Sequence, residues 1–142
     1  NLKKLMTDKN VTKIFHFARF DVAVIKEYLD IECTPVYCTK IASRLCRTYT
    51  DRHGLKELSR ELLNVNLDKQ QQSSNWGAED LSQDQLMYAA SDVLYLHKLM
   101  EKTTAMLEAV GRKELAQQCF EFLPTRAQLD LDGWTDFDIF QH

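Results

Sequence analysis

Two short runs of β-branched and aromatic residues, each followed by a helical pattern, limit the possible fold of this chain most strongly. The first run extends from Val11 to Phe17. The second, from Pro35 to Cys38, begins with a proline, which suits the first position of a strand. Helical spacing of apolar residues follows at Val22 to Leu29 and again at Ile41 to Cys46. Strands that alternate with helices predict an α/β fold, here with more helices than strands.

The rest of the chain reads mostly as helix. The predicted segments are a helix from Leu55 to about Asn64 that follows Gly54, a long helix that starts at a capping box of Ser82 and Gln85 and ends near Val110 at Gly111, and a last helix from Ala109 to Phe122 that Pro124 interrupts. We find no internal repeat and no linker between domains. Residues 1–142 are therefore expected to form a single domain.

Two short strands cannot form a sheet that buries both of its faces. The chain begins with Asn1 rather than Met, and Leu2, Leu5 and Met6 resemble the end of an amphipathic helix. We therefore expect a mixed sheet flanked by helices, in a domain that is N-terminally incomplete. The remaining strands would precede residue 1, as an antiparallel meander.

Composition excludes several functional classes. No apolar stretch approaches the roughly 20 residues that span a bilayer, and no secretory signal begins the chain. The net charge of −3 argues against a protein that coats long nucleic acid, but not against a small site that holds nucleotides through metal ions. The cysteines match no metal or redox motif, so we expect reduced thiols in a cytoplasmic protein; they are Cys33, Cys38, Cys46 and Cys119.

Three residues form the strongest candidate site. Tyr88 and Asp92 are four residues apart in a helical segment, so they lie one turn apart on the same face, at the edge of its apolar arc. Asp21 follows the first predicted strand. Two carboxylates and a phenol could hold a divalent metal and orient a water molecule. The alternative is that Asp92 pairs with a buried arginine or caps a neighbouring helix.

Two ordered motifs carry a family resemblance. The run Lys13 to Asp21 resembles the second motif of ribonuclease D-type exonucleases, and the run Tyr88 to Asp92 resembles their third, in the tyrosine form of the DEDD superfamily. Further similar segments are Leu55 to Leu58 and Ser74 to Trp76. The segments that resemble the nanoRNase C branch are Thr39 to Arg44, Gln70 to Ser74 and Leu123 to Arg126.

The resemblance implies a ribonuclease H-like fold and a 3′–5′ exoribonuclease. Asp21 and Asp92 match two metal-binding carboxylates of the family, and Tyr88 matches the residue that orients the attacking water. Two ions, Mg²⁺ or Mn²⁺, would act in hydrolysis to nucleoside 5′-monophosphates. The branch implies short RNA substrates down to dinucleotides and ring-like homo-oligomers such as an octamer.

The position of the family's first motif, an Asp-x-Glu on a strand, would precede Asn1. We therefore expect the isolated chain to be weakly active or inactive. Predicted substrate-binding residues are His16, Gln72, Ser74 and Trp76, although His16 could be a core histidine and Trp76 could simply pack its loop. Arg126 and the aromatic tail are candidates for contact with a neighbouring subunit. The alternative for Trp134, Phe137 and Phe140 is burial within one subunit.

Two other functions remain open at this stage. One is a catalytically inactive fragment that serves as an oligomeric scaffold through its C-terminal helices. The other is a DNA-directed repair exonuclease of the same fold, which the absence of a basic face disfavours.

Overall fold

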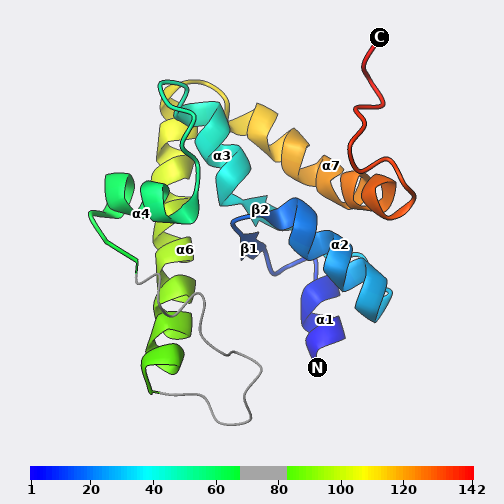
Figure 1. Cartoon of the computed structure of the whole chain (residues 1–142), viewed down its shortest axis with the longest axis horizontal. Coiled ribbons are helices and arrows are strands. Elements are labelled where there is room, and N and C mark those ends of the chain that lie inside the picture. The colour runs from blue at the N-terminus through cyan, green and yellow to red at the C-terminus, as the bar shows by residue number, and fades with distance from the viewer. Residues whose placement is uncertain (68–82) are drawn as a thin grey trace.

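The computed structural model describes the backbone of residues 1–67 and 83–142, and the side chains of residues 1–67 and 94–142. The elements of this part of the chain are α1 (Leu2–Thr7), β1 (Lys13–Phe15), α2 (Ala18–Leu29), β2 (Val36–Cys38), α3 (Thr39–Cys46), α4 (Leu55–Leu63), α6 (Gln83–Ala109) and α7 (Lys113–Leu131). Helices outnumber strands, as predicted, and Figure 1 shows their arrangement.

The two strands pair in parallel. Lys13 lies opposite Val36 and Phe15 lies opposite Cys38. The first strand is shorter than the predicted run from Val11 to Phe17, because its partner offers only three residues for pairing. Parallel pairing places the carboxyl ends of both strands at one edge of the sheet, and α2 and α3 both begin at that edge.

A backbone hydrogen bond at this edge links the segment that leads into α2 to the first turn of α3. The Lys40 N–H donates to the His16 carbonyl at 3.3 Å. The residue that precedes α3 is Cys38, so Thr39 is the first helical residue rather than the cap. The Thr39 side chain is fully buried and serves a different purpose, described below.

Two groups of packed helices surround the sheet. Helices α3 and α4 pack against α6, whereas α2 packs along α7 (Figure 1). The core joins the strands to α2, α3, α6 and α7; its larger members are Val22, Val36, Tyr37, Leu107, Phe120 and Leu123. The rings of Tyr37 and Phe120 lie 4.6 Å apart, and the Tyr37 hydroxyl hydrogen bonds with Thr103 at 2.8 Å. This contact connects β2 to both long helices.

The predicted interruption of the last helix at Pro124 is wrong, because α7 continues through the proline. A proline inside a helix removes one backbone donor and crowds the carbonyl four residues earlier, here that of Phe120. Phe120 and Leu123 before the proline and Ala127 after it are all buried on one face. Burial of that face on both sides of Pro124 offsets the cost and keeps the helix intact.

The predicted end of the long helix is confirmed. Helix α6 ends at Ala109, and Gly111 follows with a φ of 72°, a conformation that favours glycine. The Arg112 N–H donates to the Leu107 carbonyl at 2.9 Å, which gives a partner to one of the last carbonyls of the helix. The predicted capping box lies outside the described part, since Ser82 and the Gln85 side chain are not described.

Asp130 holds the C-terminal tail (residues 133–142) against α2. Arg19 donates two hydrogen bonds to the Asp130 carboxylate, both at 2.7 Å, and Arg126 donates two more, at 2.9 and 3.2 Å. The two arginines also donate to carbonyls of the tail, Arg19 to Thr135 and Arg126 to Trp134.

The aromatic side chains of the tail are not buried within this subunit. Trp134, Phe137 and Phe140 are 46%, 54% and 66% exposed, respectively. The four cysteines are free, so the expected reduced thiols agree with the structure. Within the described residues, no helix is both long and apolar enough to cross a bilayer.

The buried Phe120 ring provides a test of the core. We expect Phe120→Ala to lower the free energy of unfolding by about 3–5 kcal/mol, because the substitution leaves a cavity beside Tyr37. Urea denaturation measures this change. Phe137→Ala removes an exposed ring of the same size and should stay within about 0.5 kcal/mol of the native chain. Equal losses in both variants would contradict this description of the core.

The Asp130 cluster predicts a dependence of stability on pH. The hydrogen bonds from Arg19 lower the pKa of Asp130 more than its burial raises it. Its stabilisation is therefore present above the unfolded-state pKa of about 3.9 and is lost as the pH falls through the lower folded-state value. When the free energy of unfolding is measured against pH, we expect Asp130→Asn to lose less stability at acid pH than the native chain does. An equal loss of stability at acid pH in the two proteins would rule out the contribution of Asp130.

Candidate active site

Asp21 is a half-buried carboxylate in the first turn of α2. Its N–H donates to the Phe17 carbonyl at 3.3 Å, which fixes its place one turn after the end of β1. Burial raises the pKa of the Asp21 side chain. Among the described residues, no side chain forms an ion pair with it. A partly buried carboxylate without a partner is costly unless a cation or a donor is supplied.

The two residues predicted to act with Asp21 lie on α6. The backbone is helical at Tyr88 and Asp92, so their spacing places both on one face of the helix. Helix α6 also contacts β1, the strand that leads to Asp21. The side chains of Tyr88 and Asp92 are outside the described part, and so the meeting of Asp21 with Asp92 remains a prediction.

The described residues supply only part of a metal site. No cluster of three or more histidine, cysteine, aspartate or glutamate side chains occurs among them. The Asp21 carboxylate is nevertheless the type of oxygen ligand that Mg²⁺ and Mn²⁺ prefer. It fits such a cation because it is half-buried and has no competing lysine or arginine in the described part. Asp92 would be the second ligand.

Three of the predicted substrate-binding residues are not described. Gln72, Ser74 and Trp76 lie within residues 68–82, outside the described backbone. The fourth, His16, follows β1 directly and lies at the edge where both helices begin.

The hydrogen bonds of His16 favour a proton on Nδ1. Its Nδ1 lies 2.9 Å from the Thr39 hydroxyl, and that hydroxyl donates to the Phe15 carbonyl at 3.4 Å. Since the hydroxyl proton is used there, we assign the Nδ1–H as the donor to Thr39. The Nε2 atom is then a bare acceptor, and it is buried with no hydrogen-bond partner among the described residues.

The charge state of His16 is also constrained. Burial is the main cause that lowers its pKa, and the positive charges of Lys40 and Arg44 add to the effect, which brings the pKa to about 4. At neutral pH the ring is therefore uncharged. His16 is suited to accept a hydrogen bond from a hydroxyl or amide, and it is unsuited to neutralise a phosphate.

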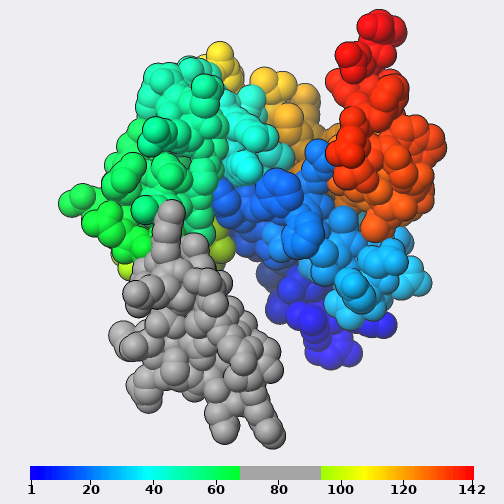
Figure 2. All heavy atoms as spheres, in the orientation of Figure 1, coloured from blue at the N-terminus to red at the C-terminus, as the bar shows by residue number. Residues whose placement is uncertain are grey.

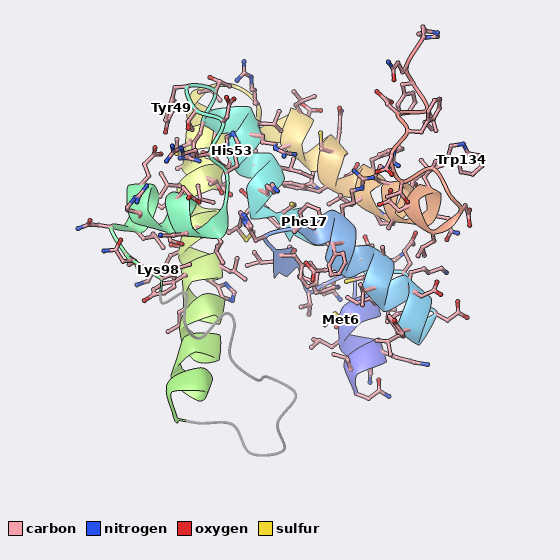
Figure 3. All side chains as sticks on the ribbon, in the orientation of Figure 1. Met6, Phe17, Tyr49, His53, Lys98 and Trp134 are labelled. Carbon is pink, nitrogen blue, oxygen red and sulfur yellow. The ribbon has the colours of Figure 1, made fainter. Side chains whose placement is uncertain are left out.

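A second polar cluster holds the loop between α3 and α4 beside His16. The Ser43 hydroxyl lies 2.7 Å from the Nδ1 atom of His53, and Arg47 donates to the same hydroxyl at 2.8 Å. The buried Arg47 also forms an ion pair with Glu61 at 2.8 Å, and Tyr49 donates to that carboxylate. Figure 3 labels Tyr49 and His53 on this loop. The cluster is saturated with partners, and so its evident role is structural.

Sequence reasoning missed the parts played by Thr39 and Phe17. The Thr39 hydroxyl lies 2.9 Å from Nδ1 of His16 and orients that ring. Phe17 is 46% exposed and lies under the Lys40 ammonium, which is 4.8 Å from the ring centroid. Topology could have pointed to both residues, because each follows a parallel strand at its carboxyl end, where ligands of α/β sheets bind.

Comparison with known proteins identifies the family. The sequence pattern of the 3′–5′ exonuclease family matches residues 1–108. Ribonuclease D of Jannaschia sp. (strain CCS1) is 34% identical over 121 residues, which cover 82% of this chain and 31% of that protein. The chain thus spans about a third of this curated relative.

Solved structures give the same result. Brucella melitensis NrnC is 60% identical with a TM-score of 0.91, over all of this chain and 69% of that one. Its structures include one with bound Mg²⁺ and one bound to pGG. Escherichia coli RNase D is 28% identical with a TM-score of 0.79, over 95% of this chain and 36% of that one.

The family match covers the helix starts that hold Asp21 and His16 and extends along α6 past Tyr88 and Asp92. The fold is accordingly that of the exonucleases, which are ribonuclease H-like, and the predicted resemblance is confirmed. This chain belongs to the ribonuclease D-like 3′–5′ exonuclease family.

Proposed function

We propose that this chain forms part of a metal-dependent 3′–5′ exoribonuclease that hydrolyses short RNA to nucleoside 5′-monophosphates. The observation that supports this most directly is the half-buried Asp21 carboxylate, which has no cationic partner in the described residues and lies in the run that resembles the family's second motif. The similarity to Brucella melitensis NrnC, which has been solved with Mg²⁺ and with pGG, supports both the metal and the short substrate.

Asp21 and Asp92 would hold the divalent ions, which we propose to be two Mg²⁺ or Mn²⁺. Such ions, when bound, lower the pKa of a water molecule and stabilise the leaving oxygen. The role of this chain's own residues is to fix the site. Asp21 supplies oxygen from the first turn of α2, where the helix dipole favours negative charge. Tyr88, one turn before Asp92, would orient the attacking water.

His16 would bind the sugar of the terminal nucleotide. Its bare Nε2 atom is an acceptor, and a ribose hydroxyl is a donor of the matching kind. Since Nε2 is buried, this contact requires a small displacement of the atoms that cover it. Gln72, Ser74 and Trp76 remain predicted contacts to phosphate, ribose and base.

Substrate length and assembly belong to the same proposal. A preference for dinucleotides is supported by the similarity to NrnC, and a ring-like homo-oligomer is supported by the exposed aromatic side chains of the tail. The free cysteines are consistent with the predicted cytoplasmic location. The competing functions are an inactive scaffold, which would bind no metal, and a DNA-directed exonuclease, which would prefer deoxyribose.

Removal of the Asp21 charge tests the metal site. We expect Asp21→Asn to weaken Mn²⁺ binding about tenfold or more, because a charged oxygen ligand becomes a neutral amide. Cleavage of a 5′-labelled RNA dinucleotide, which we expect to be weak in the isolated chain, should fall further, by about a hundredfold. The titration follows free Mn²⁺ by electron paramagnetic resonance. Asp30→Asn is the control, because Asp30 lies at the opposite, C-terminal end of the same helix and its side chain is 94% exposed.

Two results would contradict the proposal. One is that Asp21→Asn binds Mn²⁺ and cleaves RNA as the native chain does. The other is that the native chain binds no Mn²⁺ while it forms a stable oligomer, which would favour the scaffold. Cleavage of a DNA dinucleotide faster than the RNA dinucleotide would instead support the repair exonuclease.

The uncharged His16 makes a separate prediction. His16→Phe keeps an aromatic ring but removes both ring nitrogens, including the Nε2 acceptor. We therefore expect KM for RNA dinucleotides to rise about tenfold while kcat changes little. The preference for RNA over DNA should shrink in the same variant. Because the pKa of His16 is about 4, the native activity should show no inflection from this residue between pH 6 and 8. An unchanged KM would show that His16 has only a structural role.

A further inference from the structure

A cavity of about 510 Å³ lies between the start of α2, the start of α3 and residues 115–126 of α7. Ligand pockets typically have volumes of about 300–1,000 Å³, so this one can hold a small molecule. Neither Asp21 nor His16 lines it. It is therefore separate from the candidate active site, and an inference drawn from it does not depend on the proposed nuclease function.

The walls of the cavity are aromatic and aliphatic. Phe17, Phe122 and Phe140 are 46%, 37% and 66% exposed. The Lys40 ammonium lies over the Phe17 ring, so Phe122 and Phe140 offer the freer rings for stacking. The rings of Phe122 and Phe140 lie 6.1 Å apart, so α7 and the C-terminal tail form one aromatic side together. Phe17 belongs to another element, at the start of α2 (Figure 3). A planar ligand would thus meet aromatic rings from more than one element.

The rim of the cavity is positively charged. Lys40 and Arg44 lie four residues apart on α3, so both side chains project from one face of that helix. Within the described part of the chain, neither forms an ion pair with a carboxylate. The N-terminal end of α3 also opens here, since Cys38, Lys40 and Ile41 line the cavity, and a helix N-terminus favours negative charge.

The other arginines near the cavity differ from this pair. Arg19 and Arg126 both form hydrogen bonds to Asp130, whose carboxylate offsets part of their charge. They also hold the C-terminal tail in place, and Figure 2 shows that tail in red beside the blue start of α2. Because the chain's own tail already borders the cavity, a second copy's tail is a poorer occupant than a small anion.

We infer that this cavity binds a nucleoside 5′-monophosphate. The base would stack on the phenylalanine rings, as bases do on aromatic side chains in single-strand binding proteins. The phosphate would lie at Lys40, Arg44 and the start of α3, where positive charge has no carboxylate partner in the described residues. The position at the carboxyl ends of two parallel strands agrees with the usual place of ligands in α/β sheets.

The test is calorimetric titration of the complete chain with GMP, in a buffer that contains EDTA. EDTA removes divalent ions, so the candidate active site does not contribute to binding. We expect saturable binding of GMP, with guanosine and ribose 5-phosphate each about tenfold weaker, because each lacks one half of the interaction. Lys40→Gln with Arg44→Gln should weaken GMP binding by about tenfold or more.

Three further variants make the test specific. Phe140→Ala should weaken GMP binding severalfold without disturbing the fold, since its ring is mostly exposed. Lys98→Gln removes an exposed lysine from α6, away from the cavity, and should leave binding unchanged. Asp21→Asn should also leave it unchanged.

Several results would overturn the inference. These are absence of GMP binding to the native chain, binding that survives the Lys40 and Arg44 substitutions, and binding that is lost in Asp21→Asn. A self-association that the Lys40 and Arg44 substitutions abolish, in a chain that does not bind GMP, would assign the cavity to a second copy of the protein.

Discussion

The parallel pairing of β1 with β2 is the constraint on which the rest of the structure depends. The pairing is only three residues long, yet it brings the carboxyl ends of both strands to one edge. His16 and Thr39 meet there, and the backbone bond from Lys40 to His16 fixes the start of α3 against the start of α2. Asp21 follows one turn into α2. The candidate active site and the separate cavity thus share this edge of the sheet.

Most buried polar groups of this protein are fully paired, and the exceptions are informative. The ammonium of Lys13 donates to three backbone carbonyls, and Arg47 is surrounded by Glu61, Ser43 and a loop carbonyl. By contrast, the Asp21 carboxylate, the Nε2 atom of His16 and the buried Ser59 hydroxyl have no partner in the described residues. A stable fold gains nothing from such gaps, because an unpaired buried group costs about 1–3 kcal/mol. The unpaired Asp21 carboxylate instead suits an external cation, and the unpaired Nε2 atom of His16 suits an external hydrogen-bond donor.

Local patterns predicted the helices and both strands well, because apolar spacing and glycine positions act over a few residues. The end of α6 before Gly111 and the start of α4 after Gly54 are examples. Pro124 was misread because its cost is local whereas its compensation, the burial of Phe120 and Ala127, comes from packing with distant elements. For the same reason, the sequence could not show that Thr39 orients His16 or that Phe17 and Lys40 border a cavity. Asp21 was found because its motif is local.

The central claim is that Asp21 is a ligand to a divalent cation within this exonuclease fold. Anomalous diffraction from crystals soaked in Mn²⁺ tests it most directly, because the metal is located without reference to activity. The account predicts an anomalous peak about 2.0–2.6 Å from an Asp21 carboxylate oxygen, shared with Asp92. Ordered Mn²⁺ elsewhere on the protein, with no peak at Asp21, would contradict it.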